Sequence, residues 1–276
     1  MFIINASLHR AGSTLFSNIM GNHPDIYASP TSTLVDLVYG GHYAWSTALD
    51  TMSEGIDPNN KYYTDKRAES VKSFFNKGIE VYYDEITDKQ HVLDKGRRWM
   101  SSPEFVKEIL PDTTIFCMIR HPFDIFASFE KIYRTTPMIV KEEVGNSTIE
   151  RINYWGQNVP SFQTFAYIRN AIEKQNDNVY FIPYELLTED PEKTMTEIYK
   201  YLGIVDYKHD FSNIKQVTHE TDVQSIYGTH KIRPEVKPMK QNPVEILGLQ
   251  ACLAIQQELG WFMDYFGYEK LEQEKE

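Results

Sequence analysis

The sequence predicts a single α/β domain in which a central, mainly parallel sheet is flanked by helices. Strand-like apolar runs cover residues 2–6, 91–93, 114–119 and 179–183. The run at 114–119 has no polar interruption, as is typical of a parallel strand buried on both faces. Each run is followed by a polar turn, and segments of helical periodicity lie between the runs. A chain of 276 residues is long enough to bury the core of one such domain.

Composition and charge narrow the possible functions. Hydrophobic residues make up 41% of the chain and charged residues 24%, as in ordinary globular proteins. We expect one domain over residues 1–268 and a charged, frayed tail over 269–276. The net charge of −11 argues against nucleic acid as a partner. It leaves room for a small polyanion, because screening over about 8 Å lets local cations control a pocket.

The two cysteines, Cys117 and Cys252, stand in apolar surroundings and are predicted to be core residues. No group of Cys and His has the spacing of a zinc site, so no metal is expected. The first residues enter a strand directly, without the pattern of a signal peptide or a membrane span. We therefore predict a cytosolic protein without a membrane partner.

The first strand leads into the turn His9-Arg10-Ala11-Gly12-Ser13-Thr14, and a helix is expected from there to about Gly21. A strand, tight turn and helix in this order direct backbone N–H groups and the positive helix end at the turn. The hydroxyls of Ser13 and Thr14 and the guanidinium of Arg10 add donors suited to oxyanions. The turn therefore predicts a phosphate or sulfate site.

This turn is not a Walker A loop, which requires Gly-x4-Gly-Lys-Ser/Thr. When Gly12 is aligned with the second glycine, Ser7 occupies the first glycine position and Ser13 the lysine position. An ATPase or kinase of the usual kind is disfavoured as a result.

Between the turn and the second apolar run, the pattern predicts an extended piece over residues 25–29 and a helix capped by Ser32. Gly40 and Gly41 are expected to interrupt that helix. A turn is predicted at residues 57–60 and helical structure over 68–75. The run at 91–93 ends at Asp94 and Lys95, where an open sheet would bind a ligand. For this stretch alone, a solvated basic face with Trp99 as a core anchor is the favoured interpretation.

The run at 114–119 ends at Arg120, and Pro122 suits the first turn of the next helix. Ser128 lies on that helix and points back toward its start, so Arg120 and Ser128 converge on one oxyanion. The last strand, 179–183, precedes Tyr184, after which Asp190 as cap, Pro191 and Gly203 frame a further helix. A late loop over residues 225–234 and a helix from Pro243 to Met263 complete the chain.

These segments, in this order, resemble the PAPS-dependent sulfotransferases (PAPS is 3′-phosphoadenosine 5′-phosphosulfate). The resemblance runs from residue 2 to about 205 and implies a P-loop nucleotide-kinase-like fold. It implies that the turn binds the 5′-phosphosulfate, that Arg120 and Ser128 bind the 3′-phosphate, and that Tyr184 lies near the nucleotide. It also implies that Lys231 or Arg233 of the late loop closes over the nucleotide. The cofactor-binding residues on this basis are Arg10, Ala11, Gly12, Ser13, Thr14, Arg120, Ser128, Tyr184, Lys231 and Arg233.

In these relatives a lysine at the position of Lys95 lies beside the transferred sulfonate. The general base is not evident by resemblance, because Thr31 stands where one branch has a glutamate and Arg97 where another has a histidine. From the residues that remain we rank Asp36 first, then His42, with Asp94 third.

The resemblance thus predicts sulfonate transfer from PAPS to a hydroxyl or amine, with release of PAP and without a metal. The acceptor is a small molecule, glycan or peptide, and the sequence indicates neither which of these it is nor the oligomeric state. Two alternatives stay open. One is a nucleotide or small-molecule kinase on the same fold, and the other is a PAP-binding module without catalytic activity.

Overall fold

The sheet has five parallel strands in the order β2-β3-β1-β4-β5. The computed structural model describes residues 1–53, 61–135, 144–157, 161–220, 230–239 and 241–272. The strands are β1 (Phe2–Asn5), β2 (Ile26–Thr31), β3 (His91–Lys95), β4 (Ile115–Ile119) and β5 (Val179–Pro183). All four neighbouring pairs run parallel. The predicted parallel α/β domain is therefore confirmed.

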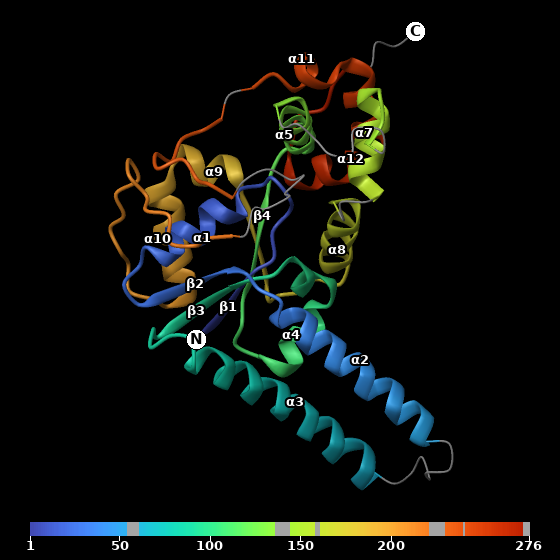
Figure 1. The fold of residues 1–276 in the computed structure, drawn as a ribbon, viewed down its shortest axis with the longest axis vertical. Coiled ribbons are helices and arrows are strands. Elements are labelled where there is room, and N and C mark those ends of the chain that lie inside the picture. The colour runs from blue at the N-terminus through green and yellow to red at the C-terminus, as the bar shows by residue number, and fades with distance from the viewer. Residues whose placement is uncertain (54–60, 136–143, 158–160, 221–229, 240, 273–276) are drawn as a thin grey trace.

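Helices cover both faces of the sheet. Figure 1 shows α1 (Ser13–Gly21) and α10 (Pro191–Leu202) on one side and α8 (Ser161–Glu173) and α12 (Leu249–Phe266) on the other. Neighbouring residues of β5 serve opposite faces, because Tyr180 packs on Tyr201 of α10 and Phe181 packs on Phe266 of α12. The remaining helical elements are η1 (Arg97–Ser101), α4 (Pro103–Ile109), α5 (Pro122–Thr135), α7 (Thr148–Gln157), α9 (Tyr184–Glu189) and α11 (Pro243–Leu247).

Two long helices, α2 (Leu34–Ser53) and α3 (Lys61–Asp84), extend together away from the sheet (Figure 1). The expected interruption at Gly40 and Gly41 is wrong, because α2 passes through both residues. At Gly41 the reason is packing, since a Cβ there would lie 3.3 Å from the ring of Phe75 on α3. The turn predicted at residues 57–60 lies outside the described residues.

The chain end differs from the sequence prediction in two ways. The helix expected from Pro243 to Met263 is divided at Gly248, whose φ of +85° and ψ of 152° are accessible to glycine but not to other residues. Part of the tail is held in place rather than frayed. Gln256 on α12 accepts a hydrogen bond from the N–H of Leu271 at 2.7 Å, and His121 bonds the carbonyl of Glu269 at 3.0 Å. Residues 273–276 lie outside the described chain.

Alanine substitutions at a glycine of α2 and at a glycine near the chain end should change the free energy of unfolding in opposite directions. A Cβ added at Gly40 meets no atom within 4 Å, so Gly40→Ala should raise the free energy of unfolding by about 0.5–1 kcal/mol. Gly248→Ala is the matched control, because space is also open there but the backbone is strained for alanine, and a loss of about 1–3 kcal/mol is expected. Urea unfolding followed by circular dichroism measures both. A destabilising Gly40→Ala would show that α2 does break at this point.

Candidate active site

The carboxyl ends of the strands bring the predicted site residues to one edge of the sheet. Asn5 at the end of β1 pairs with Lys95 at the end of β3, and Thr31 at the end of β2 pairs with Lys95 from the other side. On the opposite half of the sheet, the last pair of β4 and β5 is Ile119 with Pro183. Arg120 and Tyr184 follow these two residues directly, so they are neighbours at the same edge.

The turn after β1 has the conformation of an anion-binding loop. Gly12 has a φ of +92° and precedes the first helical residue of α1, while Arg10 has a φ of +57°, which is uncommon outside glycine. A Cβ at Gly12 would lie 2.7 Å from Cδ2 of Tyr184, so both backbone and space require glycine there. The first N–H groups of α1 have no partner within the helix and face the loop, as an oxyanion site needs.

Buried polar side chains under the loop fix its path. Asn5 donates from Nδ2 to the carbonyl of Ser13 at 3.0 Å and to Oγ of Ser17 at 2.8 Å. Ser7 donates to Asn5 and accepts the backbone N–H of Met118 on β4 at 2.9 Å. The loop is thereby tied both to its own helix and to the neighbouring strand.

Two guanidinium groups meet at the loop. Arg10 donates from Nε to Oγ of Ser128 on α5 at 3.0 Å, and Arg120 donates from Nη1 to the carbonyl of Arg10 at 3.2 Å. The guanidinium carbon of Arg120 stands 4.4 Å from the ring centre of Tyr184. Burial, and after it the charge of Arg120, lowers the pKa of Arg10. The structure thus brings Arg10, Arg120, Ser128 and Tyr184 together.

Arg120 has donors that the described protein does not use. Its side chain is 5% exposed, yet Nε and Nη2 have no hydrogen-bond partner among the described residues. Asp124 lies 3.9 Å from Nη2, beyond hydrogen-bond range, and its Oδ1 accepts from Gln241 at 2.7 Å instead. Burying donors of a charged group without partners is costly. An anionic ligand at this point would satisfy them.

These groups line a cavity of about 300 Å³. Its described lining contains six Arg or Lys residues and one carboxylate, although the whole chain carries a net charge of −11. Lys231 and Arg233 line it from one end of the predicted late loop, whose residues 225–229 lie outside the described chain. We refer to it as the cationic cavity. Its charged lining residues are Arg10, Arg97, Arg120, Lys231, Arg233, Lys237 and Glu235.

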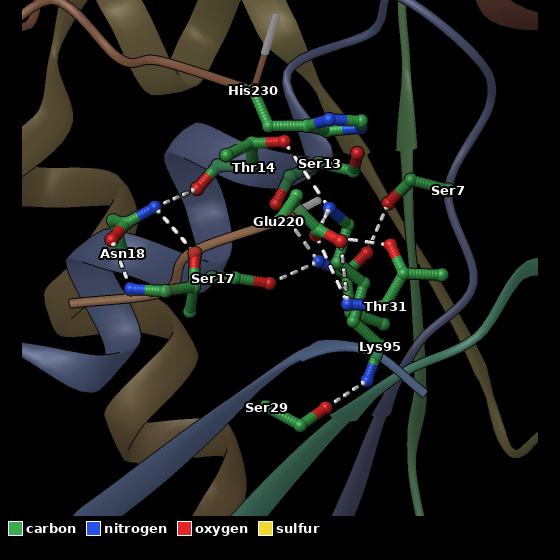
Figure 2. A network of polar contacts seen from close by, with 12 residues as sticks. Ser7, Ser13, Thr14, Ser17, Asn18, Ser29, Thr31, Lys95, Glu220 and His230 are labelled. Atoms are coloured by element: carbon green, nitrogen blue, oxygen red, sulfur yellow. Dashed lines mark hydrogen bonds and ion pairs between the residues drawn. The ribbon is translucent and has the colours of Figure 1, made fainter. Parts of the chain in front are cut away.

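Lys95 stands at the edge of this site and is buried. Its Nζ lies 3.2 Å from Oγ1 of Thr14 at the start of α1 and 2.6 Å from Oε1 of Glu220 (Figure 2). Glu220 also accepts hydrogen bonds from the backbone N–H and the hydroxyl of Thr31, each at 3.0 Å. The lysine therefore joins the anion-binding loop between β1 and α1 to the ends of β2 and β3.

Other predicted residues lie apart from this cluster. Ala11 is fully buried beneath the loop. Asp36 is half exposed, forms an ion pair with Arg98 and borders a second cavity of about 180 Å³ that also includes Thr31 and Arg97. His42 packs its ring on Phe105 of α4, with 4.1 Å between ring centres. Among the described residues that line the cationic cavity, neither Asp36 nor His42 is found.

The third base candidate, Asp94, is fully enclosed. It accepts hydrogen bonds from Tyr83 and, at 2.7 Å, from Nε1 of Trp99. Burial raises the pKa of this carboxyl. Trp99 is fully buried in the core, and Asp94 holds its indole in place.

The sequence prediction did not include Glu220, His9 or Lys237. Glu220 is separated from Lys95 by 125 residues, and the local pattern around it contains no signal of their contact. His9 and Lys237 line the cationic cavity. His9 stands within the loop, at a position to which the sequence pattern assigns no role. Within the part of the chain that the structure describes, no helix is long and apolar enough to cross a membrane, and no three His, Cys, Asp or Glu residues are grouped as metal ligands.

A parallel sheet with an anion-binding loop after its central strand defines an α/β protein built for phosphate or sulfate esters. Residues 2–208 match the family model described as the sulfotransferase family. The chain therefore belongs to the sulfotransferase family and is a sulfotransferase enzyme. No curated protein matches it in sequence.

Solved structures agree on the fold. The sulfotransferase domain from the curacin biosynthetic pathway is 13% identical, with a TM-score of 0.54 and 98% of both chains covered. Sulfotransferase STF9 from Mycobacterium avium is 14% identical, with a TM-score of 0.57, covering 98% of this chain and 78% of that one. Mouse sulfotransferase SULT7A1, solved in complex with PAP, is 15% identical, with a TM-score of 0.50, and the match covers 95% of this chain and 84% of that one. At these identities the likeness concerns the fold.

His9 gives a test of the electrostatics at this site. Burial, and after it the charges of Arg97 and Arg10, lowers its pKa from the usual 6.5 to about 2. Between about pH 2 and pH 6.5 the unfolded chain therefore binds more protons at His9 than the folded chain does. The free energy of unfolding consequently falls as the pH is lowered below 6.5. The His9 ring should show no NMR titration between about pH 4 and about pH 8.

A His9→Gln variant is the control for this prediction. Its free energy of unfolding should fall less steeply than that of the wild type as the pH is lowered from 6.5, because glutamine takes up no proton. A His9 resonance that titrates near its usual pKa would contradict the described burial between the two cations.

Proposed function

We propose that this sulfotransferase uses PAPS as its donor and releases PAP. The observation that supports this most is the buried guanidinium of Arg120, whose Nε and Nη2 have no partner among the described residues. A nucleotide with a phosphate on the 3′ position offers oxygens for these donors, and Ser128 stands beside them through its bond with Arg10. A nucleotide without that phosphate does not.

The cationic cavity suits the rest of the nucleotide. In the proposed complex the 5′-phosphosulfate lies on the loop from Arg10 to Thr14, at the start of α1, where backbone N–H groups and hydroxyls are directed. Arg120, Ser128 and Tyr184 bind the 3′-phosphate side. Lys231 and Arg233, which also line the cavity, supply further positive charge to the nucleotide. Six basic side chains fit a ligand with several negative charges.

In the proposed reaction the acceptor oxygen or nitrogen attacks sulfur in line as the bridging S–O bond breaks. The electron pair of that bond goes to the 5′-phosphate of PAP. Lys95 is the residue whose ammonium neutralises this charge, because its Nζ already contacts Thr14 at the loop. Positioning and charge stabilisation supply most of the rate acceleration in such a transfer.

The acceptor in this proposal is a small molecule, glycan or peptide that presents a hydroxyl or amine. The cavity bordered by Thr31 and Arg97 is the side from which it approaches, because it adjoins Lys95 through Thr31. We extend the proposal to a cytosolic location, without nucleic acid or a membrane as partner.

Binding of PAP tests the role of Arg120. The wild type should prefer PAP to 5′-AMP in isothermal titration calorimetry without magnesium. Arg120→Ala should weaken PAP by about 1.5–3 kcal/mol, the value of hydrogen bonds to a charged group, and weaken 5′-AMP much less.

The matched control is Arg169→Ala, which removes an exposed guanidinium that stacks on Trp261, with 4.3 Å to the ring centre. PAP affinity should be unchanged in this variant. Equal affinity of the wild type for PAP and 5′-AMP would contradict the proposed donor, and magnesium-dependent binding of ATP would favour the kinase alternative.

Lys95→Ala separates catalysis from binding. If Lys95 acts mainly as the bridging bond breaks, its loss should lower the rate of PAP release from PAPS by about 100-fold or more. The affinity for PAP should change by less than about tenfold in the same variant. The control is Lys107→Ala, an exposed lysine paired with Asp177. A Lys95→Ala variant with the full wild-type rate would show that Lys95 has no role in the reaction.

A further inference from the structure

The carboxylate of Glu220 is buried beside the candidate active site. Its side chain is 8% exposed, and its Oε1 lies 2.6 Å from the ammonium of Lys95. Both of its oxygens lie 3.0 Å from the backbone nitrogen of Thr31, and Oε1 also accepts from the hydroxyl. A buried carboxylate with this many donors is fixed in place, not a surface group.

The segment before Glu220 is attached to α1. Asn18 accepts the backbone N–H groups of Val217 and Thr218 at 2.6 Å and 3.0 Å, and donates to Oγ1 of Thr218 at 2.9 Å. Asn22, one turn further along, donates to the carbonyl of Lys215 at 2.8 Å. The helix α1, which begins at the anion-binding loop, therefore also holds the segment that places Glu220 beside Lys95 (Figure 2).

The order of contacts indicates what the carboxylate faces. The ammonium of Lys95 contacts both Thr14 of the loop and Glu220. A donor bound at the loop would therefore lie close to Lys95, which joins the loop to Glu220 and through it to Thr31. Thr31 borders the cavity assigned above to the acceptor. The carboxylate thus contacts both Lys95 and Thr31, and Thr31 connects it to the acceptor cavity, whose described lining does not include Glu220 itself.

From this geometry we propose that Glu220 is the general base of the reaction. This rests on the proposed sulfonate transfer from PAPS. As the acceptor oxygen bonds to sulfur, its proton passes to the Glu220 carboxylate, and the bridging S–O electron pair goes to the 5′-phosphate of PAP. The products are the sulfate ester, PAP and protonated Glu220, which returns the proton to solvent. A proton acceptor must lie within hydrogen-bond reach of the attacking group, and this one does so for a group held at Thr31.

The ionisation of Glu220 is compatible with this role. Burial raises its pKa, but the charge and hydrogen bond of Lys95 and the bonds from Thr31 lower it further, so that the net change is downward. The carboxylate is therefore ionised at neutral pH, which is the state that a proton acceptor requires. When PAPS engages Lys95, the carboxylate exchanges part of that contact for the acceptor hydroxyl.

The other carboxylates and imidazole near the site fit less well. Asp36 borders the acceptor cavity, but it is half exposed and paired with Arg98, and it is not bonded to Lys95. Asp94 is enclosed and held by Tyr83 and Trp99. His42 packs on Phe105. Of the groups considered as base, Glu220 is the one bonded to Lys95.

Glu220→Gln, nearly identical in shape, tests the proposal. Enzyme in excess over sulfur-labelled PAPS is mixed with water alone, with phenol, or with p-nitrophenol at about pH 8, where phenol keeps its proton and p-nitrophenol is ionised. PAP release is followed in a single turnover, and PAP affinity is measured by calorimetry. We expect the variant to bind PAP within about threefold of the wild type. We expect it to lose about 100-fold or more with water and phenol, but less than about tenfold with p-nitrophenol, which needs no base.

The outcomes separate the two proposals. Equal losses on all three acceptors would overturn the base role, because they would show that Glu220 only positions Lys95. Full rates in Glu220→Gln with water and phenol would also overturn it while leaving the proposed function intact. A wild type that neither binds PAP nor releases it from PAPS would instead overturn the proposed function. Glu189→Gln, an exposed carboxylate at the end of α9, is the matched control and should keep wild-type rates.

Discussion

The site depends on the burial of two like charges at the carboxyl edge of one sheet. Arg10 and Arg120 are linked through a single backbone carbonyl, and the repulsion between them is one of the reasons that the pKa of Arg10 is lowered. Such a pair is tolerable only where the fold holds both groups rigidly. The rigidity comes from the strands below, from Ser128 on α5 and from the ring of Tyr184. An anion bound between the two guanidinium groups would offset this repulsion.

The rest of the loop follows from the same constraint. Arg10 has a positive φ although it is not glycine, a conformation of the kind that is retained at functional sites when the surroundings enforce it. Those surroundings are the bonds of Asn5 and Ser7 beneath the loop. The acidic exterior does not oppose a polyanion at this point, because charges on the far surface are screened over about 8 Å.

Local features of the sequence predicted which side chains the structure brings together where both partners lie next to strand ends. Arg120 and Ser128 are eight positions apart, and the geometry of a strand followed by a helix brings them together. Glu220 could not be found in this way, because its contact with Lys95 depends on side chains of α1 that hold a loop from the far end of the chain. Periodicity also predicted an unbroken last helix, since the apolar pattern continues through Gly248 while the backbone does not.

The strand order divides the edge of the sheet into two regions. Thr31 and Lys95 follow β2 and β3 on one side of β1, whereas Arg120 and Tyr184 follow β4 and β5 on the other. The two regions share the central strand, its loop and Arg97, which borders both cavities. Substitutions in the chain after β2 can therefore reshape one half of the edge without moving the guanidinium of Arg120. A protein with this layout can change its acceptor during evolution, or by engineering, while its donor stays the same.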